Sequence, residues 1–242
     1  MISWFWKMSI IDSIKSSFFV PIHPAGMPFI IIFCLITVVI GWIWYPLFYI
    51  GLITTIWCIY FFRNPVRFPP EDKSNDLIIA PADGKIVEIS KVIPDEEVGL
   101  PSNNYVKVGI FMNVFNVHVN RSPMKGKIIS KNYIPGLFFN ASLDKSSKEN
   151  ERLALAMDVG ENCKIAFVQI AGLIARRIVT DVEVGEELRV GDVFGLIRFG
   201  SRVDIYFPEG SINKVLVGQT TIAGETVIAK LNRNKTSKKN KK

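Results

Sequence analysis

The chain is 242 residues long, and no Asp, Glu, Lys or Arg occurs between Ser16 and Phe62. An uncharged stretch of this length is too long for one membrane-spanning helix, which needs about 20 residues. It is interrupted at Gly41-Trp42-Ile43-Trp44-Tyr45-Pro46, where aromatic residues and a proline are typical of a turn at a bilayer interface. We therefore predict two apolar helices, at residues 28–44 and 46–62, that form a hairpin. With about 17 residues each, they are at the short end for spanning a bilayer.

The residues that flank the hairpin suggest how it is oriented. Apolar side chains recur at helical spacing in residues 1–19, which predicts a short helix lying in the membrane interface. Lys7 and Lys15 precede the hairpin, and Arg63 and Arg67 follow it closely. By the positive-inside rule, both ends and the rest of the chain are expected on the cytoplasmic side of a cell membrane. A cleaved signal peptide is the weaker alternative, because the apolar stretch is too long.

The remainder of the chain has the pattern of a β protein. We predict a linker at residues 63–76, a folded body at 77–231 and a tail at 232–242. Short apolar runs separated by turn residues are typical of an all-β sandwich or barrel. Strands are expected at 85–93, 105–111, 114–119, 126–133, 153–159, 164–170, 177–182, 193–199, 203–207 and 226–231. The segment 184–192 resembles turns of biotinyl and lipoyl domains. The predicted fold is therefore a mainly β barrel-sandwich behind a hydrophobic helical hairpin.

Charge and metal-ligating residues exclude several classes of function. Seven of the 29 basic residues lie from Lys230 onward, where no acid occurs, so the other 22 balance the 22 acidic residues. The tail is expected to be a solvated, disordered end or, alternatively, a tether to anionic lipid. No aromatic-basic interleaving indicates nucleic-acid binding. The three cysteines and two histidines are too scattered for a disulfide framework or a zinc site, so no metal is expected.

One dipeptide, Gly200-Ser201, lies between two strand-like runs. Its ordinary interpretation is a turn or bulge. It also permits self-cleavage, because the Ser201 hydroxyl can attack the unhindered Gly200 carbonyl and convert the peptide into an ester. Elimination across Ser201 then releases a chain that ends at Gly200. The dehydroalanine left behind tautomerises, hydrolyses and loses ammonia to give an N-terminal pyruvoyl group.

Two other motifs could supply the base for this chemistry. Asp83 lies in Ala-Pro-Ala-Asp-Gly, and His118 lies in a valine-rich run. Because His23 is in the apolar region, any histidine base in the body must be His118. Asp83 could orient the imidazole while His118 takes the proton of Ser201. Each residue also has an ordinary interpretation, as a turn aspartate and a core histidine.

The three motifs P-A-D-G, N-V-H-V-N-R-S-P and F-G-S-R-V-D, in this order behind a hydrophobic anchor, resemble the shorter branch of the phosphatidylserine decarboxylases. The resemblance covers nearly all of residues 60–231. It implies a pro-enzyme that is cut between Gly200 and Ser201 into chains 1–200 and 201–242, which stay together as a heterodimer. It further implies a pyruvoyl cofactor derived from Ser201 and conversion of membrane phosphatidylserine to phosphatidylethanolamine. An archaetidylserine substrate would use the same chemistry.

One departure from the family concerns the histidine motif. The longer branch carries H-x-x-H in this strand, whereas here His118 is followed three residues later by Arg121. Either His118 serves in both self-cleavage and decarboxylation, or another group serves in the second step. Arg121 could bind the substrate phosphate or carboxylate, which suit its planar guanidinium, or it could form a surface salt bridge.

A different class of function stays open beside the enzyme. A membrane-tethered carrier or adaptor with a biotinyl-like barrel would use Met124-Lys125-Gly126 as the hairpin of the modified lysine. The second methionine usual in such hairpins is absent. A carrier also has no need for Asp83, His118 and Gly200-Ser201 together.

Overall fold

The computed structural model describes residues 20–139, 149–173, 177–198 and 201–233, and the chain forms two compact units, Met1–Val66 and Arg67–Lys242. The helix predicted at residues 1–19, Gly200 and most of the basic tail lie outside the described residues. The predicted separate linker at 63–76 stays a prediction.

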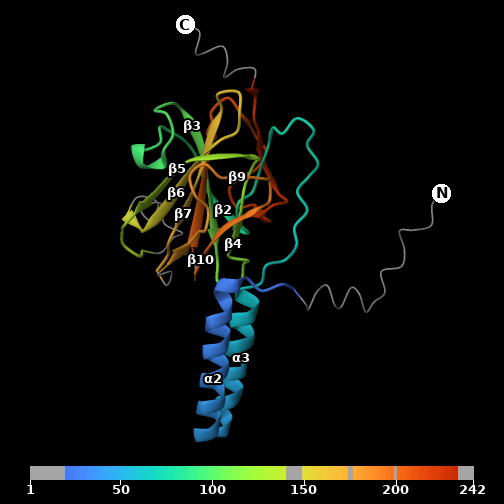
Figure 1. Ribbon diagram of the computed structural model, residues 1–242, viewed down its shortest axis with the longest axis vertical. Helices are drawn as coiled ribbons and strands as arrows, with labels where there is room; N and C mark the ends of the chain where they lie inside the picture. Colours follow the sequence, from blue (N-terminus) through green and yellow to red (C-terminus); the bar gives the residue numbers. More distant parts are fainter. Residues whose placement is uncertain (1–19, 140–148, 174–176, 199–200, 234–242) are drawn as a thin grey trace, which may run out of the picture. The chain divides into compact units, whose positions relative to one another are not determined.

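The first unit contains a pair of helices, α2 (Met27–Ile43) and α3 (Tyr45–Phe61), after the 3-10 turn η1 (Pro24–Gly26). Trp44 joins them in an extended conformation. The helices lie side by side (Figure 1) and approach closely at Gly51, where an added Cβ would lie 2.7 Å from Thr37 Oγ1. There the hydroxyls of Thr37 and Thr55 are 3.0 Å apart. The predicted hairpin is confirmed, with each helix beginning and ending one residue earlier.

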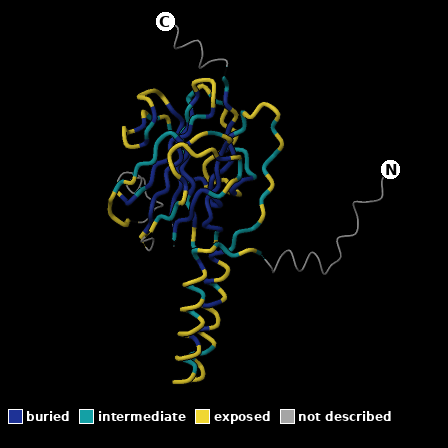
Figure 2. Tube along the Cα trace, in the orientation of Figure 1, coloured by how far each residue is buried: buried dark blue, intermediate teal, exposed yellow. Residues whose placement is uncertain are grey.

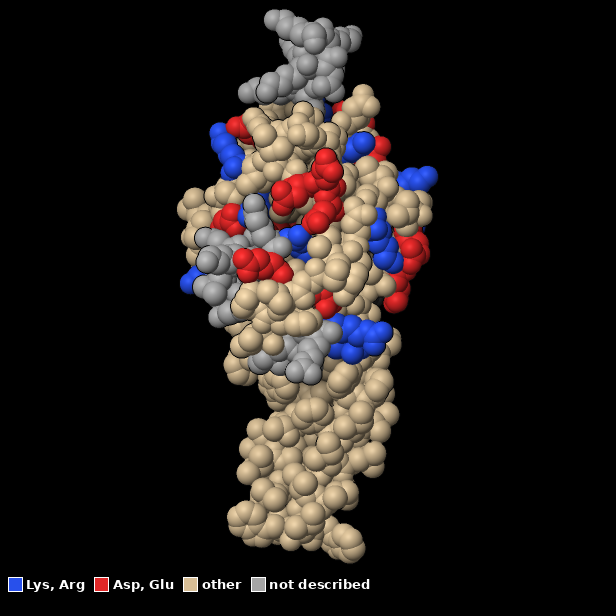
Figure 3. All heavy atoms as spheres, turned by 90° about the vertical axis from the view of Figure 1, so that its left-hand side faces the viewer, with Lys and Arg blue, Asp and Glu red and all other residues tan. Residues whose placement is uncertain are grey.

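The exposed surface of this pair is apolar. Figure 2 shows that most of α2 and α3 is exposed, and Figure 3 shows no charged side chain along them. Among the described residues, the segment Pro24–Ile43 is long and apolar enough to cross a membrane, whereas α3 has 17 residues. By its length and composition, the segment Pro24–Ile43 is therefore suited to membrane association.

The second unit is mainly β, as predicted. Its strands are β1 (Leu77–Ile79), β2 (Gly84–Val92), β3 (Tyr105–Met112), β4 (Val119–Arg121), β5 (Gly126–Ile134), β6 (Arg152–Asp158), β7 (Lys164–Ile170), β8 (Ile178–Val179), β9 (Glu187–Leu188), β10 (Val193–Ile197), β11 (Ser201–Pro208), β12 (Ile212–Asn213), β13 (Thr220–Thr221) and β14 (Val227–Lys230), with the 3-10 turn η2 (Glu96–Val98) after β2.

These strands form three antiparallel sheets. The largest is a curled, half-barrel sheet in the order β13-β2-β3-β11-β7-β6-β5-β9 (Figure 1). Two three-stranded sheets have the orders β1-β14-β12 and β4-β10-β8. In the large sheet β11 is hydrogen-bonded to β3 on one edge and to β7 on the other. The strand that begins at Ser201 is therefore central.

The large sheet is covered on both faces. Alternate residues of β11, namely Val203, Ile205 and Phe207, point into the main apolar core. The opposite face carries a smaller cluster that includes Val98, Leu100 and Val168. Strands buried on both faces read as nearly continuous apolar runs, which is why their positions could be predicted from the sequence.

Two predicted strands differ in their bounds from those in the structure. Residues 113–116 form a turn, because Asn116 Oδ1 accepts from the Asn113 N–H and Asn113 Oδ1 accepts from the Phe115 N–H. Asparagine side chains that bond to nearby backbone groups compete with strand formation. The strand predicted at 114–119 is therefore replaced by β4, which begins at Val119. The strand predicted at 177–182 is limited to Ile178 and Val179.

Candidate active site

Ser201 is the first residue of the central strand β11 and pairs with Met112 of β3. It points to the same face as Val203, toward the main core, and is fully buried. Among the described residues, its hydroxyl oxygen has no hydrogen-bond partner. Leaving a buried polar group unsatisfied costs about 1–3 kcal/mol, so such a group is a candidate for chemistry rather than for stability.

Asp83 lies in the bend before β2, as expected, and its loop reaches the same end of the sheet as Ser201. An added Cβ at Gly84 would lie 2.2 Å from the carbonyl oxygen of Phe111, the residue before Met112. The Asp83 carboxylate accepts hydrogen bonds from Arg67 Nη2 at 2.8 Å and from the Ala223 N–H at 2.7 Å. The structure therefore gives Asp83 an arginine partner that the sequence did not predict.

His118 is fully buried and lies between the 113–116 turn and β4. Its Nδ1 atom is 3.0 Å from the carbonyl oxygen of Asn116. A carbonyl oxygen can only accept, so Nδ1 carries the proton and Nε2 is the basic nitrogen of the neutral ring. The main chain thus fixes the tautomer, a role that the sequence assigned to Asp83. The relay from Asp83 through His118 to Ser201 stays a prediction.

Arg121 is the last residue of β4, and its side chain is buried. It is therefore not on the surface, where the alternative role in a surface salt bridge would place it. Its Nη1 atom donates to the Gly191 carbonyl at 2.9 Å. Burial and the positive charge of Arg67 lower its pKa, against the opposing effect of nearby carboxylates that include Asp83. The substrate-binding role of Arg121 stays a prediction.

Comparison with known families identifies the family of the chain. A family model described as phosphatidylserine decarboxylase matches residues 54–229. The chain belongs to the phosphatidylserine decarboxylase family. The match includes Asp83, His118, Arg121 and Ser201, and it supports decarboxylation of phosphatidylserine. Assignment to the shorter branch stays a prediction.

Behind Ser201, the opposite face of the large sheet carries a buried network of charges. Arg202 and Asp204 are both fully buried, and Arg202 bonds to the carboxylates of Asp204 and Glu88. Lys107 Nζ also bonds to Glu88, at 2.8 Å. There is room for the guanidinium because position 109 is glycine, where an added Cβ would lie 2.4 Å from Arg202 Nη2.

Burial raises the pKa of Asp204 despite the opposing charge of Arg202, but the other charges of this network stabilise one another. Burial would raise the pKa of Glu88, but hydrogen bonds from Lys107, Ser90 and Arg202 outweigh burial and lower the pKa to about 2. Burial would lower the pKa of Arg202, but the carboxylates of Asp204 and Glu88 raise it further. Arg202 is therefore charged at neutral pH, and its side chain fixes β11 beside Ser201.

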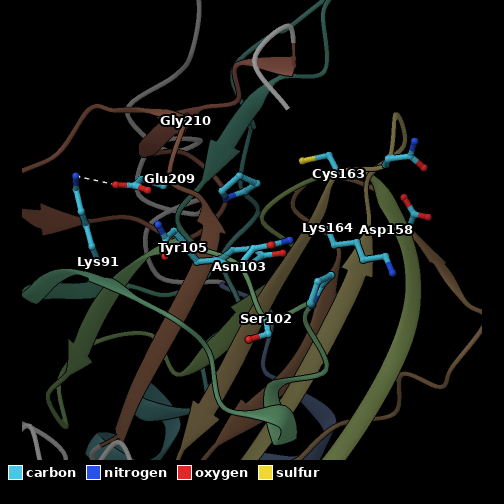
Figure 4. A pocket seen from close by; sticks show the side chains of 13 residues that line it. Lys91, Ser102, Asn103, Tyr105, Asp158, Cys163, Lys164, Glu209 and Gly210 are labelled. Carbon is cyan, nitrogen blue, oxygen red and sulfur yellow. Dashed lines mark ion pairs between the residues drawn. The ribbon is translucent and has the colours of Figure 1, made fainter. Parts of the chain in front are cut away.

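A surface pocket of about 1180 Å³ lies at the other end of β11 (Figure 4). It is lined by Pro208 and by the ion pair of Lys91 with Glu209. At about 3.3 Å per residue, the seven steps from Ser201 to Pro208 separate the two places by roughly 23 Å. Burial raises the pKa of Cys163, another lining residue, to about 11, so its thiol is not a nucleophile at neutral pH. This pocket is not part of the Ser201 site.

The sequence did not predict four residues around the site, which are Arg67, Glu88, Asn120 and Gln169. Asn120 lies within the histidine motif and could have been noticed there. Gln169 is the polar member of the apolar run Ile165–Ala171, which is an unusual residue for a buried strand. No sequence pattern pairs Arg67 with Asp83.

We predict that Asp204→Ala destabilises the body by about 3–5 kcal/mol, because it leaves Arg202 buried with only part of its compensating charge. The free energy of unfolding can be measured by urea-dependent proteolysis of the full chain in detergent micelles. Glu209→Ala is the control, because its partner Lys91 is largely exposed and exposed pairs contribute under about 1 kcal/mol. Equal stability of the two variants would contradict a structural role for the network.

Proposed function

We propose that the chain is a self-processing, pyruvoyl-dependent phosphatidylserine decarboxylase. The observation that supports this most directly is Ser201, a buried serine at the start of the central strand whose hydroxyl has no partner among the described residues. Membership of the family supplies the overall reaction. The position of Ser201 suggests how the chain prepares itself for that reaction.

In the proposed cleavage, His118 Nε2 takes the Ser201 hydroxyl proton while Oγ bonds to the Gly200 carbonyl carbon. The Gly200–Ser201 C–N bond breaks, and the nitrogen takes up a proton. Loss of the Ser201 α-proton then expels the Gly200 carboxylate from Cβ and leaves dehydroalanine. This tautomerises, and water replaces its nitrogen, which leaves as ammonia. The products are a chain ending in a carboxylate and a chain beginning with pyruvoyl.

A pyruvoyl carbonyl at position 201 would condense with the substrate amine and accept electrons as carbon dioxide leaves. The surroundings of position 201 fit a pyruvoyl group, because the Ser201 hydroxyl, which has no partner among the described residues, shows that a polar group is buried there. Pairing of β11 with β3 and β7 would fix the new terminus. Burial would limit the access of bulk water, and His118 could return a proton after decarboxylation. Arg121 is proposed to bind the phosphate or carboxylate of the substrate.

The proposal also includes the location of the enzyme in the cell. The apolar pair α2 and α3 would hold the body at the cell membrane, where phosphatidylserine resides. Arg63 and Arg67, directly after α3, favour a cytoplasmic position for the body. The chains 1–200 and 201–242 would remain associated as a heterodimer, because β11 belongs to the second chain and both its neighbours belong to the first.

The wild-type protein is expected to consist of two chains, the smaller with 42 residues (242 − 200). Its first residue should resist Edman degradation and have the mass of pyruvoyl in place of Ser201. Ser201→Ala should stay a single chain without decarboxylase activity. An intact, active protein with an unmodified Ser201 would exclude this mechanism, and a covalent group on Lys125 would favour the carrier alternative.

His118→Ala is expected to slow cleavage by about 10²–10⁴-fold, the usual loss when a general base is removed. The rate can be followed by gel electrophoresis of newly synthesised chain. His23→Ala is the matched control, because His23 lies in the first unit, outside the body that contains Ser201, and its Nδ1 accepts a backbone N–H from Ala25 at 3.3 Å. Cleavage of His118→Ala at the control rate would show that His118 is not the base.

A chain that begins at Arg67 is expected to cut itself, because it retains Asp83 and its partner Arg67 as well as His118 and Ser201. Its activity on phosphatidylserine vesicles should fall by about tenfold or more, because the tether that raises its local concentration is lost. Activity on detergent-dispersed substrate is the control and should change much less. Equal vesicle activity of the short and full chains would contradict anchoring by α2 and α3.

A further inference from the structure

Two buried amide side chains connect the large sheet to the sheet β4-β10-β8. Gln169 of β7 and Asn120 of β4 are both fully buried, and Gln169 Nε2 donates to Asn120 Oδ1 at 2.8 Å. The other polar atom of the glutamine, Oε1, has no hydrogen-bond partner among the described residues. A buried amide oxygen is costly to leave without a donor, so this pair is not explained by packing alone.

The pair is close to position 201. Gln169 is the cross-strand neighbour of Val203, and Ser201 lies two residues along the same face. Such diagonal neighbours are about 7–8 Å apart, within reach of a long side chain. From the other side, Asn120 Nδ2 is 3.6 Å from the sulfur of Met112, which pairs directly with Ser201. Both amides therefore border the reactive position.

The backbone leaves room for this arrangement at Gly195. An added Cβ there would lie 3.1 Å from Gln169 Nε2 and 2.5 Å from the Val179 carbonyl oxygen. Gly195 pairs with Asn120 across the small sheet. A side chain at position 195 would therefore displace the glutamine, and its absence keeps the amide fixed against Asn120.

We propose that Gln169, oriented by Asn120, binds the amino group of the substrate, with Oε1 accepting a hydrogen bond from the nitrogen that reacts at position 201. This inference rests on the proposed function. The ligand class is a primary amine, because Oε1 can only accept a hydrogen bond and the amine is the donor group that would react at position 201. A neutral amide also suits the chemistry, since a carboxylate in its place would favour the protonated, unreactive amine.

Gln169→Met tests this role, because methionine has a similar shape but no amide oxygen. The full-length variant should still cut itself, and borohydride should reduce its small chain to the same extent as in the wild type. Trapping of phosphatidylserine from vesicles onto the small chain by cyanoborohydride should be about ten- to a hundredfold slower, the loss expected when a buried N–H donor is left without its hydrogen-bond partner. Gln219→Met, at an exposed glutamine, is the control and should trap at the wild-type rate.

Gln169→Glu provides a readout that a merely structural residue would not change. It should shift the pH dependence of trapping to higher pH, because a carboxylate stabilises the protonated amine. His118 and Asp83 are present in both proteins, so the comparison with wild type isolates the substitution. If Gln169→Met does not fold or cut, this pH profile decides the assignment.

The outcomes separate this inference from the proposed function. Wild-type trapping by Gln169→Met, or an unchanged pH profile in Gln169→Glu, would overturn the role of Gln169 and leave self-processing intact. A wild-type small chain with no carbonyl that borohydride can reduce would instead overturn the pyruvoyl proposal. Slow trapping with normal cleavage and normal borohydride reduction would support the assignment, because the carbonyl is then present and only capture of the amine is impaired.

Discussion

The pairing of β11 with a neighbour on each edge is the constraint on which the site depends. Ser201 is paired with Met112, and Arg202, the next residue, is paired with both Phe111 and Ile170. A strand held on both edges cannot move without breaking two ladders of backbone hydrogen bonds. Position 201 is therefore fixed by the backbone, independently of which side chain or group it carries.

This arrangement also explains how a chain could be cut at position 201 without falling apart. Eight residues, Ser201–Pro208, lie between strands that precede the cut in the sequence, and Val203, Ile205 and Phe207 are buried in the core. No disulfide is needed, and the described cysteines are free. The new chain end would stay where the serine was, because the interactions that hold it do not pass through the broken bond.

Much of the architecture could be predicted because it depends on local patterns. The uncharged stretch predicted both helices to within one residue, and the apolar runs predicted the long strands. The turn at 113–116 could not be predicted from the same runs, because two asparagine side chains decide it. The site was predictable only in part. Asp83, His118 and Ser201 stand in motifs, whereas the contacts of Arg67 with Asp83 and of Gln169 with Asn120 join segments 16 and 49 residues apart.

The two faces of the large sheet carry different sets of polar groups. Arg202, Asp204, Glu88 and Lys107 lie on the face opposite Ser201, where their charges compensate one another. Around Ser201 itself, the amides of Asn120 and Gln169 are neutral, and Asp83 is already paired with Arg67. A free carboxylate beside position 201 would hold an amine in its protonated form, which cannot attack a carbonyl. Placing the charged network behind the strand anchors position 201 and, in the proposed mechanism, would leave its other side able to accept an uncharged amine.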